Sequence, residues 1–482
     1  MLFKYSMILR IGIIVLILII AAYLRVWNLG GKFSYDYDEG VYAMSARMIL
    51  KGYKPFKEVF SSQPSFHLYG IALFLLIFGM NIVAARLFSV FLSLVGILAT
   101  YLLTSYLEDE KAGIIAAIFL AITPYFLYYS RAVEAEVPCI SLAILAFYMA
   151  FKAIESSNRN VLYSLFSGVV FGMAISTKLL AVYTALPILL LFLIKRKFKF
   201  LSIFIGGAMI VPAIIALSLG PREVIAQAII MHLNKPPTGT FESRLALLVK
   251  FLSRDSGLAI LSLIGTLFSI TTDIANREFK RTLLVIWHYA TIISLLNYKA
   301  LFIHHYVILM PTFAMLASLS LVTPFNFMIR TCSIYSEYII RALALASIPC
   351  LFSASVYVYH LPEVINYDMY LLKYKDIEYY EAIASFIKEH TSPNDFIITD
   401  QQALAFLADR NVPPNLVDTS HMRISSGFLT SEMMISLTKK YNVKMVIFWT
   451  GRLIRLREFV NYVKANFKLI KSYGSGREIY IS

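Results

Sequence analysis

The chain has 482 residues, of which 59% are hydrophobic and only 15% are charged, and its mean hydropathy is +0.70. These values exclude a water-soluble globular domain and indicate a polytopic membrane protein. The net charge of +15 does not indicate nucleic-acid binding. Short cytoplasmic loops of membrane proteins produce such a basic excess, and no basic stripe is interleaved with stacking aromatic residues. The three cysteines lack CxxC spacing, so they predict neither a disulfide framework nor a zinc site: Cys139, Cys332 and Cys350.

Apolar runs along the chain predict about eleven membrane spans. Hydrocarbon about 30 Å thick requires roughly 20 apolar residues of helix to cross it. The first run is too long for a signal peptide and lacks a small-residue cleavage site, so we expect a signal anchor. The predicted spans are 8–27, 82–106, 112–129, 138–153, 161–177, 179–194, 200–219, 257–273, 282–297, 302–322 and 341–359.

Basic residues in the short loops predict the orientation of these spans. If the spans alternate, the basic loops share one side with the N-terminus, and the positive-inside rule makes that side the cytoplasm. The acidic segment 108–113 lies on the same side and breaks the rule. We therefore expect a plasma-membrane protein with the N-terminus inside and with residues 28–81, 130–138 and everything beyond 360 outside. The basic positions are Lys4, Arg10, Lys152, Arg159, 195–199, 277–281, Arg330 and Arg341.

The predicted extracytoplasmic segments differ in composition. Residues 66–79 are apolar but too short to cross, which predicts an interfacial or re-entrant helix. Residues 220–250 are expected to form a long loop. Beyond about residue 365 the mixed sequence predicts a small α/β domain without a nucleotide-binding motif. We therefore divide the chain into a transmembrane domain, 1–360, and an extracytoplasmic domain, 361–482. Within the latter we expect helices at 376–390 and 401–410, strands at 396–399 and 443–449, and a final edge strand at 477–482.

The segment YDYDEGVY at residues 35–42 places Asp36, Asp38 and Glu39 directly after the first span. A solvated surface loop is one interpretation of these acids. Ionised groups near hydrocarbon are costly, however, and usually mark a transport or catalytic path. The helical pattern that follows places Asp38 and Glu39 near a helix N-terminus, where unpaired backbone N–H groups stabilise a carboxylate. We therefore expect acids in fixed positions.

Four segments together resemble a known family. They are residues 35–89, from YDYDEGVY to FGMNIVAARLFS, then SRAVEAEVP at 130–138, AISTKLLAVYTALP at 174–187 and HHYVILMP at 304–311. Their order and predicted side are similar to those of the GT-C polyprenyl-phosphate-dependent glycosyltransferases, family 39-like. The nearest branch is the protein O-mannosyltransferases and the lipid A aminoarabinose transferases. The likeness covers most of the chain, although no single segment is diagnostic.

This resemblance implies transfer of a sugar, with inversion, from a lipid-linked phosphate to an acceptor hydroxyl outside the membrane. Such a reaction needs a carboxylate to take the acceptor's proton and cations to stabilise the departing phosphate. The family pattern implies that Asp38 is the base, that Glu39 orients it or contacts the acceptor, and that Glu136 is a second-loop acid. Alternatively, Glu134 and Glu136 only solubilise their loop. Acids on two loops, Asp38 and Glu136, could also hold a divalent metal, which stays open as a cofactor.

Basic residues near the predicted outer ends of the spans are candidates for binding the donor phosphate: Arg131, Lys178, Lys299, His304 and His305. The alternatives are snorkelling for the lysines and interfacial packing for the histidines. Tyr42 and Gln63 are candidates for the substrate loop. Gln63 stands before Pro64 where the aminoarabinose branch carries a lysine, which favours the mannosyltransferase-like side. His232, Lys235 and Arg244 lie in the 220–250 loop without a role that the sequence supports.

The hypothesis is thus a glycosyltransferase that moves a mannose-like hexose or an aminosugar to a protein, glycan or lipid acceptor. The rival is a transporter or lipid flippase, but transporters usually show repeats and broken helices with polar groups near the midplane, whereas here the acids cluster in loops at one face. An oligosaccharyltransferase subunit is disfavoured because the C-terminal region has no WWDYG segment. The sequence does not discriminate the sugar or the acceptor.

Overall fold

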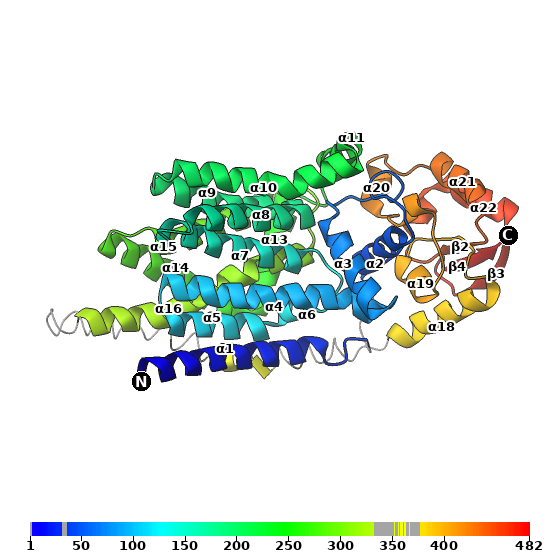
Figure 1. Ribbon diagram of the computed structural model, residues 1–482. Helices are drawn as coiled ribbons and strands as arrows, with labels where there is room; N and C mark the ends of the chain where they lie inside the picture. Colours follow the sequence, from blue (N-terminus) through cyan, green and yellow to red (C-terminus); the bar gives the residue numbers. More distant parts are fainter. Residues whose placement is uncertain are drawn as a thin grey trace.

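The computed structural model describes residues 2–30, 36–331 and 376–482, together with isolated positions between 351 and 366. Figure 1 shows long helices packed side by side, with a smaller part containing a sheet at one end and the N-terminus at the other. The bundle confirms the predicted polytopic helical fold. Its helices are α1 (Leu2–Val26), α4 (Ile82–Leu107), α5 (Glu110–Ile122), α6 (Pro124–Ser130), α7 (Glu136–Glu155), α8 (Asn160–Thr177), η1 (Leu179–Thr184), α9 (Ala185–Ile194), α10 (Phe198–Leu219), α14 (Ser256–Asn276), α15 (Lys280–Asn297), η3 (Ile303–Leu309) and α16 (Met310–Thr331).

Six of the described helices are long and apolar enough to cross a membrane, or seven if the bent pair α5 and α6 forms one span. This assessment rests on length and composition alone. Each predicted span up to residue 322 nevertheless coincides with a helix or with two consecutive helices. The span predicted at 341–359 and the predicted domain boundary at 360/361 fall outside the described residues, apart from isolated positions.

Two segments differ from the sequence-based expectation. The span predicted at 112–129 is broken, because α5 and α6 meet at an angle of 62°. Pro124 starts α6 and cannot donate an N–H to α5, and it also disfavours helical backbone at Thr123. The 220–250 region is mostly helical rather than a loop. It forms α11 (Pro221–Ile225), the π-helical turn η2 (Ala226–Ile230), α12 (Met231–Asn234) and α13 (Phe241–Arg254).

Small residues set the close packing of the bundle. A Cβ added to Gly168 of α8 would lie 2.2 Å from the Phe204 carbonyl oxygen of α10. At Gly265 of α14, an added Cβ would lie 1.8 Å from the carbonyl oxygen of Leu316 in α16. Only glycine lets these backbones approach so closely, which is a common device where lipid provides no hydrophobic drive between helices.

The acidic segment at 108–113 is neutralised at its own end of the bundle. Glu108 pairs with Arg281 at 2.7 Å, and Glu110 pairs with Arg10 at 2.8 Å. Arg281 also contacts Asp273 at 3.0 Å. The segment that breaks the positive-inside pattern therefore presents acids that are already paired with basic residues.

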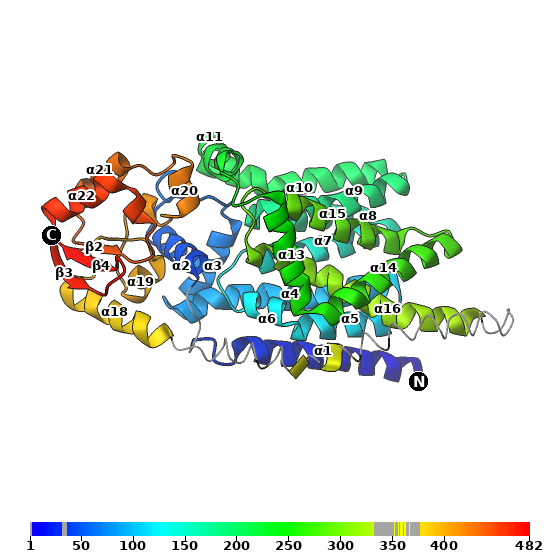
Figure 2. The same ribbon diagram turned by 180° about the vertical axis from the view of Figure 1, so that it is seen from behind.

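Two helices of the first predicted outer loop lie between the bundle and the C-terminal part, α2 (Tyr37–Leu50) and α3 (Phe66–Phe78). Figures 1 and 2 show both of them at the end of the bundle that faces the sheet. The apolar segment predicted at 66–79 is thus a short helix at that end. Its exposed apolar residues include Leu73, Leu76 and Phe78.

The C-terminal part is built around a four-stranded sheet in the order β1-β2-β4-β3. Strands β1 and β2 are parallel, and β4 is antiparallel to both β2 and β3. Its elements are α18 (Asp376–His390), β1 (Ile397–Thr399), α19 (Gln402–Leu407), η4 (Pro414–Leu416), α20 (His421–Ser425), α21 (Ser431–Lys440), β2 (Met445–Phe448), η5 (Leu453–Arg455), α22 (Arg457–Asn466), β3 (Lys468–Ser472) and β4 (Glu478–Ile481).

The prediction that the last strand is an edge strand was wrong. Strand β4 lies inside the sheet, and β3, which the sequence did not reveal, forms the edge beside it. Most side chains of β3 are exposed, so it lacks the buried pattern of a strand. A tight turn that includes Gly474 and Gly476, both with positive φ, joins β3 to β4 as a hairpin.

The C-terminal part packs on α2 through α19. An added Cβ at Gly40 of α2 would lie 2.4 Å from the backbone nitrogen of Ala403 in α19, so the two helices are in backbone contact. Ionic and polar contacts continue this interface, because Arg47 pairs with Asp409 and Lys51 hydrogen-bonds to Asn411. The helix that carries the candidate base is therefore also the docking surface for the C-terminal part.

Candidate active site

A cavity of about 810 Å³ lies between the end of the bundle and the C-terminal part. Segments that are far apart in the sequence line it. They are the start of α2, the loop before α3, the segment between α12 and α13, the η3 region, and two loops of the C-terminal part. The lining includes Asp36, Tyr37, Asp38, Tyr42, Gln63, Lys178, Lys235, Tyr298, His304, His305, Asp418, Ser420, His421 and Arg452.

Asp38 lies in the first turn of α2, as predicted, and lines the cavity. Burial raises the pKa of Asp38, and the charge of Asp36 raises it further, whereas His304 and Lys178 oppose the shift. A raised pKa brings a carboxylate closer to the pH at which a base both holds and releases a proton efficiently. Asp38 therefore combines access to the cavity with a pKa that is shifted upward by burial.

Glu39 lies beside Asp38 but does not line the cavity. Its two carboxylate oxygens accept hydrogen bonds from Arg86 at 2.7 and 2.8 Å, and both side chains are almost completely buried. The same carboxylate accepts the backbone N–H of Val133 at 3.1 Å. Of the two roles expected for Glu39, contact with an acceptor is not supported by the geometry, and orienting Asp38 stays a prediction. Glu39 joins the first outer loop to the second.

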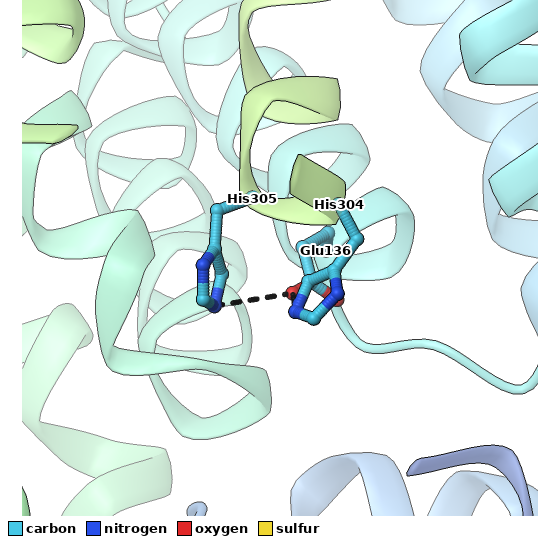
Figure 3. A group of neighbouring side chains, drawn as sticks. All are labelled: Glu136, His304 and His305. Atoms are coloured by element: carbon cyan, nitrogen blue, oxygen red, sulfur yellow. Dashed lines mark ion pairs between the residues drawn. The ribbon is translucent and has the colours of Figure 1, made fainter. Parts of the chain in front are cut away.

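Glu136 is the centre of a buried group at the start of α7. Lys178 forms an ion pair with its Oε1, and the Nε2 atoms of His304 and His305 lie 3.4 and 3.7 Å from the same oxygen. Figure 3 shows both imidazoles reaching Glu136 from adjacent positions of η3. Lys178, His304 and His305 also line the cavity. The structure thus brings together three of the five candidate phosphate-binding residues.

Glu136, His304 and His305 have ligand atoms within 4.8 Å of one another, which is the spacing of a metal site. Two observations argue against a metal ion here. Nδ1 of His305 accepts the backbone N–H of Phe302 at 3.0 Å, so the neutral ring carries its proton on Nε2, the atom that faces Glu136. Lys178 already supplies a positive charge to the same Glu136 oxygen. Asp38, the other metal ligand that the sequence left open, is not in the group. These residues fit an ion pair better than they fit a metal ion.

Arg131 and Lys299 do not line the cavity. Arg131 donates to the carbonyl oxygens of Leu24 and Trp27 at 2.8 and 2.7 Å, so it holds the end of α1. Lys299 is exposed and donates to the carbonyl oxygen of Leu233 at 3.3 Å. For these two residues the prediction of a phosphate contact is not supported. Their charges are used to fix backbone segments around the site.

Lys235 is a cavity residue to which the sequence gave no role. Its Nζ lies 3.1 Å from Nδ1 of His232, whose Nε2 lies 2.6 Å from the carbonyl oxygen of Ser62 and 3.3 Å from Nε2 of Gln63. Burial lowers the pKa of Lys235 to about 8. The sequence signal that could have pointed to Lys235 is the pair of prolines that follows it, at 236 and 237. They predict a rigid segment that would hold the lysine in place.

The second-loop acid Glu134 is fully buried, and neither carboxylate oxygen has a hydrogen-bond partner among the described residues. Burial raises its pKa well above the usual value, and the charges of Glu136 and Asp38 act in the same direction. Burial therefore favours the neutral form of Glu134 over the charged form. Glu136 forms an ion pair with Lys178, whereas Glu134 forms none with the residues that the structure describes. Neither acid solubilises a loop, because both are buried.

The C-terminal part supplies one wall of the cavity through Asp418, Ser420, His421, Met422 and Arg452. No signal in the sequence connected these residues with the acids near residue 38, because the contacts span more than 380 positions of the chain. Tyr42 and Gln63, predicted as substrate-loop residues, line the same cavity. The C-terminal part therefore belongs to the site and is not a separate appendage.

Comparison with known proteins agrees with this architecture. Residues 62–219 match the family model described as dolichyl-phosphate-mannose-protein mannosyltransferase. The comparison with curated proteins finds no match. Among solved structures, ArnT from Cupriavidus metallidurans bound to undecaprenyl phosphate superposes with a TM-score of 0.67 at 13% identity. That match covers 99% of this chain and 98% of that one.

A second structure of that protein, in the apo state, matches with a TM-score of 0.66 at 12% identity, covering 100% of this chain and 98% of the other. The archaeal oligosaccharyltransferase AglB from Archaeoglobus fulgidus, in complex with an inhibitory peptide and a dolichol-phosphate, matches at 0.56 and 14% identity. The match covers 99% of this chain and 74% of AglB. The shared fold is that of the polytopic GT-C membrane glycosyltransferases. At these identities the structural matches show a shared fold, and the family match adds a likeness over residues 62–219.

Proposed function

We propose that this protein is a polyprenyl-phosphate-dependent glycosyltransferase that acts on the extracytoplasmic face of the membrane. The observation that carries the proposal is the cavity that Asp38 lines together with Lys178 and Lys235 and with the imidazoles of His304 and His305. A carboxylate beside a positively charged pocket is what sugar transfer from a phosphate requires, because negative charge develops on the leaving phosphate while the acceptor loses a proton.

The proposed reaction is a single displacement with inversion. The acceptor oxygen forms a bond to the anomeric carbon as the bond from that carbon to the phosphate oxygen breaks. Asp38 takes the proton of the acceptor hydroxyl, and the electron pair of the broken bond stays on the phosphate. Lys178 and the two histidines stabilise the phosphate, while Glu136 holds Lys178 in place through their ion pair.

The donor lipid and the acceptor class are parts of the same proposal. The matched structures of ArnT and AglB are described as bound to undecaprenyl phosphate and dolichol-phosphate, which supports a polyprenyl phosphate here. A neutral Gln63 in the cavity supports a mannose-like hexose over an aminosugar as the first sugar to test. The acceptor is a hydroxyl of a protein, a glycan or a lipid in the outer space.

The Asp38→Asn variant tests the proposed base. We expect it to lower the rate of transfer by ~10²–10⁴, the usual contribution of a general base, while undecaprenyl phosphate still binds. The assay uses tritium-labelled mannosyl and aminosugar donors on undecaprenyl phosphate and on dolichol phosphate, with membranes of the source organism as acceptor. Transfer at the wild-type rate by Asp38→Asn would show that Asp38 is not the base.

Flux measurements in sealed vesicles separate this function from that of a transporter or flippase. A transferase consumes the lipid-linked sugar and releases polyprenyl phosphate, whereas a transporter moves its solute without breaking the bond. We expect no movement of labelled sugar or lipid between leaflets that depends on the protein. Protein-dependent flux without breakdown of any donor would overturn the assignment as an enzyme.

A further inference from the structure

The C-terminal part contacts the residue next to Asp38 in the chain. Tyr37, the first residue of α2, is buried against the loop at 418–420. The backbone N–H of Thr419 donates to the Tyr37 hydroxyl at 2.7 Å, and the hydroxyl lies 3.3 Å from Oδ1 of Asp418, to which it donates. The hydroxyl is therefore fixed from two sides by the C-terminal part.

The ring of Tyr37 is held as well as its hydroxyl. The guanidinium carbon of Arg452 lies 3.8 Å from the ring centroid, which is a close cation–π contact. We call Asp418, Thr419 and Arg452 the Tyr37 clamp. These three residues come from two loops of the C-terminal part, and all their contacts with Tyr37 are made at the start of the helix that carries the candidate base.

The start of α2 depends on outside support. Its N-cap residue, Asp36, makes no side-chain hydrogen bond to the first turn. A helix without such a cap leaves its first N–H groups unpaired and tends to fray at that end. Asp38 stands in this first turn between Tyr37 and Glu39. Its position therefore depends on what holds Tyr37 as well as on the pair of Glu39 with Arg86.

A single buried carboxylate fixes the loop that carries Arg452. Oδ1 of Asp400 accepts the backbone N–H groups of Trp449 and Thr450 at 2.7 and 2.9 Å, and Oδ2 accepts those of Arg452 and Leu453 at 2.9 and 3.2 Å. Asp400 is fully buried. A carboxylate that accepts several backbone N–H groups makes strong, charge-assisted bonds.

The sheet explains why Asp400 reaches this loop. Asp400 follows β1, and the loop at 449–453 follows β2, which is parallel to β1. The carboxyl ends of adjacent parallel strands meet at the same edge of a sheet, where α/β folds place their functional loops. Figures 1 and 2 show α19 between α2 and the labelled strands of the sheet.

We infer that the C-terminal part positions the candidate base Asp38 by clamping Tyr37, and that Asp400 is the positioning residue that fixes the clamp. This inference deepens the proposed function and rests on it for the role of Asp38. Asp400 touches neither the cavity nor Asp38. It acts through the backbone of the 449–453 loop, then through Arg452 and Tyr37, on the first turn of α2.

Hydrogen exchange measured by mass spectrometry on the detergent-solubilised full chain tests the mechanical part of the inference. Asp400→Asn replaces an acceptor oxygen by an NH₂ group that faces backbone donors. We expect faster exchange in peptides covering 449–453 and in those covering 37–42. Asp395→Asn is the matched control, because Asp395 lies before β1, where it accepts the N–H of Ser392. Faster exchange at 449–453 with unchanged exchange at 37–42 would overturn the inference.

Kinetics of the same variants test the link to catalysis. We expect Asp400→Asn, Arg452→Gln and Tyr37→Phe to lower kcat by roughly 10–100-fold, since small misplacements of reacting groups have effects of this size. Binding of undecaprenyl phosphate should be unchanged in Asp400→Asn, because Asp400 does not line the cavity. Arg452→Lys keeps a cation for the Tyr37 ring and should recover part of the loss, and Arg457→Gln, an exposed arginine of the same region, should behave like the wild type.

The pH profile of kcat is an independent test. A loss of folded protein would lower the measured rate at every pH without shifting the profile. The groups that act on Asp38 are Asp36, Glu136, Lys178 and His304, and burial is the main cause of its raised pKa. Loosening the first turn exposes Asp38 to water and lowers its pKa, so the acid limb of kcat should move to lower pH in Asp400→Asn. An acid limb at the wild-type position with wild-type kcat would overturn the inference. Absence of transfer by the wild type would refute the proposed function, and the exchange experiment would still decide whether the clamp exists.

Discussion

At the scale of single residues, burial decides which of the acids can react. Asp38 and Glu39 are neighbours in the chain, yet one lines the cavity and the other is tied to Arg86 and to the backbone of the second loop. Removing one partner of a buried ion pair leaves the other charge uncompensated, so we expect the loss of Glu39 or of Arg86 to destabilise the fold. The chemistry of the segment therefore falls to Asp38.

Lys235 has a testable pH dependence. Burial lowers its pKa to about 8, so the side chain is charged below that pH and neutral above it. We expect the affinity for undecaprenyl phosphate to fall as the pH rises from 7 to 9. The phosphate itself does not change over this range, because its second pKa is about 6. A binding titration at several pH values measures the effect.

Two variants serve as controls for this dependence. Lys235→Arg keeps its charge at pH 9 and should show a flat profile, since arginine stays protonated in proteins. Lys235→Ala should bind more weakly at pH 7 and should also lack the slope. His232, whose pKa burial lowers to about 3, stays neutral throughout and does not contribute. An unchanged slope in Lys235→Ala would assign the titration to another group.

At the scale of elements, α2 has two functions at once. Asp38 in its first turn lines the cavity. Gly40, two residues further on, packs against α19 of the C-terminal part. Glycine at position 40 allows the backbones of α2 and α19 to touch. The position of the candidate base is therefore set by an interface between two parts of the chain rather than by the bundle alone.

Gly40→Ala tests this packing. The new Cβ would lie 2.4 Å from a backbone nitrogen, which cannot move away as a flexible side chain could. We expect a destabilisation of about 1–3 kcal/mol, typical of overpacking, seen as a lower Tm and as faster proteolysis of the C-terminal part. Gly206→Ala in α10 is the control, because its added Cβ meets nothing within 4 Å. Equal Tm values for both variants would contradict the interface.

At the scale of the whole molecule, the basic loops and the cavity lie at opposite ends of the bundle. Figure 1 shows the N-terminus at one end and the C-terminal part at the other. With the positive-inside rule, this arrangement supports the proposal that the cavity and the C-terminal part lie outside the cytoplasm. The acids of the 108–113 segment do not oppose this orientation, since Glu108 and Glu110 are paired with arginines.

Single cysteine substitutions in intact cells test this orientation. Asn466→Cys lies on the C-terminal part and Asn158→Cys lies between α7 and α8, and both positions are exposed. We expect a membrane-impermeant maleimide to label Asn466→Cys in intact cells and Asn158→Cys only after permeabilisation. The native chain serves as the background control for its own three cysteines. The reverse pattern would invert the proposed topology.

Much of the fold follows from local patterns. Apolar length and periodicity located the bundle helices to within a few residues, and the short length of 66–79 predicted a helix that does not span. The predictions of structure that were wrong or incomplete also have local causes. Pro124 broke a run that was apolar throughout, and β3 was missed because its side chains are mostly exposed and carry no buried pattern.

The sequence by itself determined the membrane class, the helices and the acidic helix start at Asp38, because hydropathy and capping depend on neighbouring residues. Only the tertiary structure decided that Glu39 and Arg131 are tied into the scaffold, that Lys235 reaches the cavity, and that Arg452 stands against Tyr37. These are contacts between residues roughly 50 to more than 400 positions apart. No local pattern encodes such a pairing, because it depends on how the bundle and the sheet pack against each other.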